Sequence, residues 1–123
     1  MATLSIMIGQ EEANVPVTIL RLEGDIDAAT HKSLEEKASE VIVAGATSIL
    51  LDLGAVDYMG SAGFRAIHSI SNMLDQGGST GFSKSKHLKL LNPTDDVSRV
   101  IKTLGFDVYL DIFTDRDEAI RSF

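Results

Sequence analysis

The order of apolar and polar residues near the start of the chain predicts two β-strands. Residues 4–8 alternate between apolar and polar side chains, and residues 15–22 form a more apolar segment after a polar break at 10–14. A period of two places successive side chains on opposite faces of a strand. The second strand is expected to be buried mainly on one side and to end at Gly24. Its two faces carry Val17, Ile19 and Arg21, and Thr18, Leu20 and Leu22.

Three later segments have apolar residues at helical spacing, three or four positions apart. Residues 30–44 form the first, with Thr30 or Asp27 able to cap its start, and the second follows Ser61. The third, residues 94–104, combines a hydroxyl cap, an acidic first turn and a glycine after its end, which is typical of a helix. The residues expected to face the core are Leu34, Ala38, Val41 and Ile42; Gly63, Ile67, Ile70 and Leu74; and Val97, Val100, Ile101 and Leu104.

Short apolar runs predict the remaining strands. Residues 49–53 have the composition of a strand buried on both faces of a sheet, and residues 87–91 form a strand that an Asn-Pro pair stops. Residues 108–112 are expected to add an edge strand, and residues 115–123 a last helix.

Strands that alternate with helices predict an α/β fold. The length fits one domain, residues 1–123, with a mainly parallel or mixed sheet of four to five strands and helices packed against it. The Gly- and Ser-rich residues 76–85 are typical of a mobile loop.

Composition and charge narrow the classes of function. The chain carries 18 acidic and 11 basic residues, a net charge of −7, which argues against nucleic acid and anionic membranes as partners because both attract basic proteins. A protein with basic patches is a better match. The absence of cysteine excludes disulfides and thiolate metal sites and fits a cytoplasmic protein. No apolar run approaches a membrane span, and no signal peptide or membrane insertion is expected.

Two segments that follow strand ends, residues 24–27 and 56–63, are where a site is expected in an open parallel sheet. The second contains a serine between glycines, but Met59 occupies a position where a nucleophile elbow requires glycine. The glycines also lack the spacing and the lysine of a phosphate-binding loop. Asp25 and Asp27 are too few ligands for a metal site. Neither an enzyme nor a cofactor is therefore expected.

Ser61 precedes the second helix and has two interpretations. The first is ordinary capping, in which the hydroxyl accepts a hydrogen bond from a free N–H of the helix. The second uses the same geometry: a phosphate on Ser61 would meet free N–H groups and the positive end of the helix dipole. Physical chemistry alone leaves both open and favours capping, because serine caps are common.

Five stretches of the chain share their order and spacing with a known family. They are Leu22-Glu23-Gly24-Asp25-Ile26-Asp27, Ile49-Leu50-Leu51-Asp52-Leu53 with Val56-Asp57-Tyr58-Met59, Gly60-Ser61-Ala62-Gly63-Phe64-Arg65, Leu88-Lys89-Leu90-Leu91-Asn92-Pro93, and Val100-Ile101-Lys102-Thr103-Leu104-Gly105-Phe106. Together they resemble the STAS domain, and within it the bacterial anti-sigma factor antagonists. The resemblance covers nearly the whole chain.

The resemblance implies a role in partner switching for specific residues. In the family, a serine followed two positions later by glycine is phosphorylated by an anti-sigma factor that is also an ATP-dependent serine kinase, and a serine phosphatase restores the unmodified form. Ser61 matches that serine, and Asp27 matches the family aspartate after the first long strand. The residues expected to contact the partner are Asp25, Asp27, Met59, Gly60, Ala62, Gly63, Phe64 and Arg65. For Phe64, simple core packing is an equal alternative.

A departure from the family pattern keeps a second function open. Gly60 stands where the family usually has an acidic residue before the phosphorylated serine. In this second function, the chain would be a STAS interaction subunit that is not phosphorylated, for example in a transporter ATPase or a stress-signalling complex. A small enzyme or nucleotide-binding protein is a third class, which only the α/β fold supports.

Overall fold

The computed structural model describes residues 3–75 and 86–123 of the chain. Within these residues it has five strands, four α-helices and one 3₁₀ turn. In chain order these are β1 (Leu4–Glu12), β2 (Pro16–Ile26), α1 (His31–Val43), β3 (Ile49–Met59), α2 (Ser61–Asp75), β4 (Leu88–Leu91), α3 (Asp95–Thr103), η1 (Phe106–Val108), β5 (Asp111–Phe113) and α4 (Arg116–Arg121). The segment predicted as a mobile loop, 76–85, lies outside the described residues.

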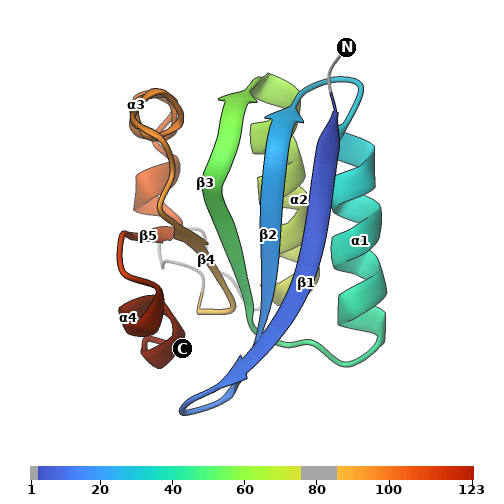
Figure 1. Ribbon diagram of the computed structural model, residues 1–123, viewed down its shortest axis with the longest axis vertical. Helices are drawn as coiled ribbons and strands as arrows, with labels where there is room; N and C mark the ends of the chain where they lie inside the picture. Colours follow the sequence, from blue (N-terminus) through green and yellow to red (C-terminus); the bar gives the residue numbers. More distant parts are fainter. Residues whose placement is uncertain (1–2, 76–85) are drawn as a thin grey trace.

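The strands form one mixed sheet in the order β1-β2-β3-β4-β5. The first pair is antiparallel, with Leu4 opposite Gly24 and Glu12 opposite Pro16, and the other three pairs are parallel. Each parallel connection contains at least one helix (Figure 1), as parallel crossovers require. The predicted α/β fold with a mainly parallel sheet is confirmed.

Helices cover the two faces of the sheet unequally. In Figure 1, α1 and α2 lie behind the strands, and their apolar residues share the larger core with α3. A smaller core lies on the opposite face, where alternate strand residues meet α4. It contains Val17, Ile19, Leu50, Leu91, Ala119 and Ile120. Among the described helices, none has both the length and the apolar character needed to cross a membrane.

These two cores correct one expectation for β2. Residues 17–20 are all buried, since Val17 and Ile19 pack under α4 while Leu20 packs in the larger core. The strand is buried on one side only further along, where Arg21 and Glu23 are exposed. The prediction of a mainly one-sided strand was therefore wrong at its start, because α4 follows almost a hundred residues later and its packing site is not visible in the local pattern.

Strand ends also differ from the sequence prediction. The predicted break between the two strands at residues 10–14 was wrong in its position, since β1 and β2 stay paired as far as Glu12 and Pro16 in a long hairpin. Strand β2 does not end at Gly24. That residue has φ +114, a conformation that suits glycine, and it lies at an irregularity after which pairing with β3 resumes. Pairing with a neighbouring strand keeps polar residues in a ladder that their own propensities would not predict.

The C-terminal third is partly as predicted. Thr94 Oγ1 accepts a hydrogen bond from Val97 N at 3.4 Å, and Gly105 adopts the left-handed conformation after α3, so both ends of that helix are confirmed. The helix predicted at residues 115–123 is α4, which spans Arg116–Arg121. The edge strand expected at 108–112 was placed too early, because η1 occupies 106–108 and β5 begins only at Asp111.

Lys89 is a charged residue within the smaller core, with 6% of its surface exposed. Its Nζ donates hydrogen bonds to the backbone O and Oγ of Ser122, at 2.9 and 3.0 Å. The ammonium also lies 4.8 Å from the ring centre of Phe123 and 5.8 Å from that of Phe113, within the range of cation–π attraction. Burial lowers the pKa of Lys89, and the carboxylate of Asp111 offsets part of that effect.

The lowered pKa of Lys89 predicts a dependence of stability on pH. The unfolded chain keeps the Lys89 proton up to its ordinary pKa of 10.5, whereas the folded chain loses it at lower pH. Between the two values the unfolded state binds more protons, so the free energy of unfolding should rise with pH. Urea unfolding at several pH values between 8 and 10.5 should give a more positive slope for the wild type than for Lys89→Met. Equal slopes would contradict this assignment.

Candidate functional site

The two segments expected to carry a site meet at one end of the sheet. Strands β2 and β3 finish side by side, with Ile26 opposite Met59, and Gly60 N donates a hydrogen bond to Ile26 O at 2.9 Å. This is the upper end of the sheet in Figure 1, from which α2 starts. Asp27, which follows β2, and Ser61, two residues after the end of β3, are therefore brought to the same edge of the sheet.

Asp27 organises the turn between β2 and α1. Its Oδ1 accepts hydrogen bonds from Ala29 N at 2.9 Å and Thr30 N at 3.2 Å. The hydroxyl of Thr30 is buried and donates to the backbone O of Asp25 at 2.8 Å. Of the two predicted caps, Thr30 occupies the N-cap position without a side-chain capping bond, and Asp27 holds the turn before it. The Asp27 carboxylate is thus fixed in place at the site edge.

Ser61 lies one position further into the helix than expected. It is the first residue of α2, and the preceding residue supplies the accepting carbonyl: Gly60 O receives hydrogen bonds from Gly63 N at 2.9 Å and Phe64 N at 3.3 Å. The predicted N-cap role of Ser61 was therefore wrong by one residue. The first N–H groups of a helix have no partner within it, so those of Ser61 and Ala62 remain without intrahelical acceptors. The Ser61 side chain is exposed.

Gly63 closes the contact between the two strands and α2. A Cβ atom at this position would lie 2.6 Å from Met59 Cγ, 2.8 Å from Ile26 Cγ2 and 3.1 Å from Ile26 O. Real Cβ atoms essentially never approach other atoms below 3.0 Å. The glycine therefore lets the first turn of α2 pack directly on the ends of β2 and β3, and this close packing positions Ser61.

The residues expected to contact a partner divide by burial. Ser61 and Arg65 are exposed, and Asp25, Asp27, Gly60 and Ala62 are partly exposed. Met59, Gly63 and Phe64 are buried in this structure. The ring of Phe64 is 2% exposed and lies 5.6 Å from that of Phe106. The structure therefore agrees with the interpretation in which Phe64 packs in the core.

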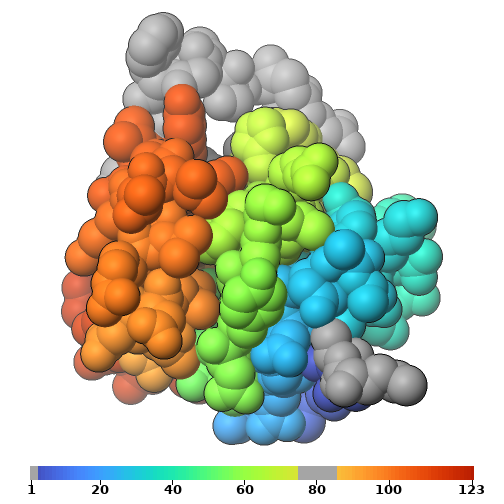
Figure 2. Space-filling model, turned by 90° about the horizontal axis from the view of Figure 1, so that it is seen from above, coloured from blue at the N-terminus to red at the C-terminus, as the bar shows by residue number. Residues whose placement is uncertain are grey.

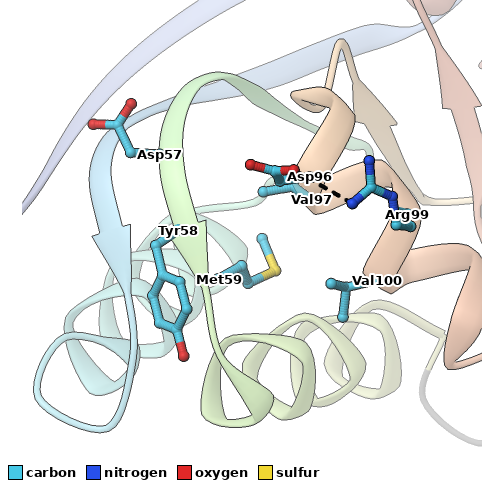
Figure 3. Close-up of a pocket in the computed structure, with 7 residues that line it drawn as sticks. All are labelled: Asp57, Tyr58, Met59, Asp96, Val97, Arg99 and Val100. Atoms are coloured by element: carbon cyan, nitrogen blue, oxygen red, sulfur yellow. Dashed lines mark ion pairs between the residues drawn. The ribbon is translucent and has the colours of Figure 1, made fainter.

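A groove beside these residues was not expected from the sequence. It has a volume of about 340 Å³ and lies between the end of β3 and α3, lined by Asp57, Tyr58, Met59, Asp96, Val97, Arg99 and Val100. We call it the β3–α3 groove. Figure 2 views this end of the molecule from above, with α3 in orange beside the green end of β3. Figure 3 shows Met59 pointing from β3 towards Val97 and Val100 of α3.

Comparison with known proteins identifies the family. The family model described as the STAS domain matches residues 10–119, which covers all the described strands and helices except the first part of β1 and the end of α4. This chain therefore belongs to the STAS domain family.

The chain is also similar to individual proteins. Over 60 residues the chain is 35% identical to the anti-sigma-F factor antagonist RsfB of Mycobacterium tuberculosis, a match that covers 49% of each protein, so the chain spans about half the length of that curated relative. The fold matches an anti-sigma factor antagonist from Mycobacterium paratuberculosis with a TM-score of 0.72, 22% identity and coverage of 94% and 92% of the two chains. It also matches the anti-sigma factor antagonist SpoIIAA in its unphosphorylated form, with a TM-score of 0.70, 23% identity and 93% coverage of each chain.

Proposed function

We propose that this chain is an anti-sigma factor antagonist that acts as a phosphorylation-switched binding module rather than as an enzyme. Unmodified, it binds an anti-sigma factor that is also a serine kinase, and so frees a sigma factor. Phosphorylation of Ser61 by that kinase ends the binding, and a serine phosphatase reverses it. The observation that carries the proposal is the exposed hydroxyl of Ser61 at the first residue of α2, beside the ends of β2 and β3.

The position of Ser61 suits a phosphate that the folded domain tolerates. A phosphate adds about 1.5–2 negative charges at neutral pH, and the start of a helix favours negative charge through its dipole and its free N–H groups. Arg65 is also exposed and lies four residues further along α2, on the same side of the helix as Ser61. A phosphate on Ser61 is therefore expected to leave the fold intact.

The same phosphate is unfavourable in a complex. A charged group buried in an interface loses its hydration, which costs several kcal/mol unless the partner supplies hydrogen bonds and opposite charge. Asp25 and Asp27 are held near this edge of the sheet and Asp57 is exposed at the end of β3, so the chain's own charges add repulsion. A partner that fits the neutral hydroxyl would be released by the dianion.

The first test is whether Ser61 accepts a phosphate. The chain is incubated with ATP and the purified serine-kinase anti-sigma factor of its own organism, and its intact mass is measured. We expect one added phosphate, none on Ser61→Ala, and an unchanged yield on Ser33→Ala, which removes an exposed hydroxyl from α1. Equal phosphorylation of Ser61→Ala and the wild type would rule out Ser61 as the acceptor.

Gly60 supports a second candidate function, that of an interaction subunit which is not phosphorylated. The family usually has an acidic residue at this position, and here the site is partly covered by an aromatic ring, since a Cβ on Gly60 would lie 3.1 Å from the hydroxyl oxygen of Tyr58. A kinase that reads the acidic residue would recognise this chain less well. Unmodified Ser61 in cells, together with co-purification with a transporter ATPase, would select this alternative.

A further inference from the structure

Helix α3 carries more apolar surface than the core uses. Val97 and Ile101 are buried, but Val100 is 39% exposed and Leu104, the residue that ends the helix, is 52% exposed. All four residues were expected in the core, and that expectation was wrong for Val100 and Leu104. Val100 and Leu104 are four residues apart and therefore lie on the same side of the helix. Of these two residues, Val100 lines the β3–α3 groove beside the buried Val97.

The floor and walls of the groove are also largely apolar. Met59 and Val97 form its buried part and Val100 forms the α3 wall. Tyr58 lines the β3 side, and its side chain, 56% exposed, points away from α3 in Figure 3. Tyrosine and methionine are enriched in protein interfaces compared with the rest of protein surfaces. A volume of about 340 Å³ is at the small end of the range for binding pockets, and suits one or two side chains of another protein.

Carboxylates at the groove give its charge. Asp57 and Asp96 are both exposed, and the one cation among the lining residues, Arg99, lies 3.7 Å from Asp96. That ion pair joins two side chains that are 84% and 75% exposed, and such a pair is weak and easily exchanged. The lining therefore carries a net charge of −1, within a chain of net charge −7. Electrostatic complementarity therefore favours a partner that carries positive charge beside its apolar contact.

We propose that the β3–α3 groove binds a segment of the partner protein that presents an aliphatic or aromatic side chain next to an arginine or lysine. The apolar side chain packs between Met59 and Val100, and the cation lies against Asp96, on the α3 side of the groove (Figure 3). This inference rests on the proposed function for the identity of the partner, and adds a second contact to the one at Ser61. The groove ends two residues before Ser61, which is not among its lining residues.

Because the groove is separate from Ser61, its contribution should not depend on phosphorylation. Substitutions in the groove are expected to weaken the binding of the unmodified chain and of the phosphorylated chain by the same factor. Ser61→Ala, in contrast, should leave the affinity of the unmodified chain unchanged and abolish the loss of binding on addition of ATP.

The test uses paired surface variants and calorimetric affinity for the serine-kinase anti-sigma factor of the same organism. Val100→Ser should weaken binding about tenfold, the usual scale for a residue central to an interface. Val43→Ser, an equivalent change at an exposed position of α1, should leave affinity within about twofold, the size of a peripheral contact. In stopped-flow mixing, Asp96→Lys should slow association at low salt, whereas Glu36→Lys, the same charge change on α1, should not. Groove variants that bind like their controls would overturn the inference and leave the proposed function intact.

If the chain does not bind that anti-sigma factor, the proposed function is refuted. A second measurement then tests the groove by itself. The ¹⁵N-labelled chain is titrated with a synthetic hexapeptide containing a leucine–arginine pair flanked by glycines, and with the same peptide carrying glutamate in place of arginine. We expect amide shifts at residues 57–59 and 96–100 with the arginine peptide that are absent from the Val100→Ser variant. No shifts at these residues, or equal shifts with both peptides, would overturn the proposal.

Discussion

Replacing Gly63 by alanine is expected to destabilise the domain by about 1–3 kcal/mol, the usual cost of an extra group in a closely packed core. The new methyl group would lie 2.6 Å from Met59 Cγ and 2.8 Å from Ile26 Cγ2. Both side chains are buried, and the third neighbour, Ile26 O, is backbone that already accepts the hydrogen bond from Gly60. The neighbours therefore have little room to move. Urea unfolding of wild type and variant gives the difference in the free energy of unfolding.

A matched glycine provides the control. Gly9 lies in β1, and a Cβ added there would meet nothing within 4 Å. Gly9→Ala should therefore change the free energy of unfolding by no more than about 0.5 kcal/mol, as is usual for surface substitutions. If Gly63→Ala were as stable as the wild type, the close contact between α2 and the ends of β2 and β3 would not be what positions Ser61.

Replacing Ser61 by aspartate is expected to weaken binding to the anti-sigma factor about 100-fold, which corresponds to about 2.7 kcal/mol. The carboxylate carries less charge than a phosphate, but it must still lose its hydration in the complex. The substitution should leave the fold unchanged, because Ser61 is exposed and the first turn of a helix favours an acidic residue. Affinity is measured by calorimetry, and unfolding by urea confirms that the variant is folded.

Ser61→Ala is the companion variant. It removes the hydroxyl without adding charge, so it should bind the anti-sigma factor about as well as the wild type and should no longer be released when ATP is added. Binding of Ser61→Asp at wild-type strength would count heavily against a switch based on charge at this position.

The architecture could be predicted from the sequence because it depends on local periodicity. The alternation of apolar strands with helices predicted a mainly parallel α/β sheet, and the cap at Thr94 and the glycine at 105 predicted α3 within a residue or two. Strand ends could not be predicted in the same way. The polar residues near Glu12 and the stretch after Gly24 remain in strands because neighbouring strands pair with them, and pairing is a tertiary property.

The site was predictable in part. The resemblance to the STAS family made Ser61 and Asp27 candidate site residues. The rule that sites lie at the carboxyl ends of parallel strands predicted that they share one edge of the sheet, which the structure confirms. Burial was not predictable from the motif: Met59 was expected to contact a partner, Phe64 was expected either to do so or to pack in the core, and both side chains are buried in the larger core. The motif identifies residues that the family shares, whether they serve packing or binding.

The β3–α3 groove could not be located from local patterns. Its two walls are separated by about forty residues in the sequence, so only the packing of α3 against the sheet creates it. The sequence did contain a sign of it, since α3 and the residue that follows it carry four apolar side chains, more than one buried face of so short a helix requires. In the structure, Val100 and Leu104 are the surplus.

The central claim is that a dianion on Ser61 is accepted by the domain and rejected by its partner. The most direct measurement is the affinity of one preparation for the anti-sigma factor in three states: unmodified, fully phosphorylated on Ser61, and treated with phosphatase. A shift from almost fully bound to almost fully free requires a change of about 10⁴-fold. We predict a loss approaching that size on phosphorylation, unchanged thermal stability, and full recovery after phosphatase treatment. Equal affinity of the unmodified and phosphorylated chains would contradict the account.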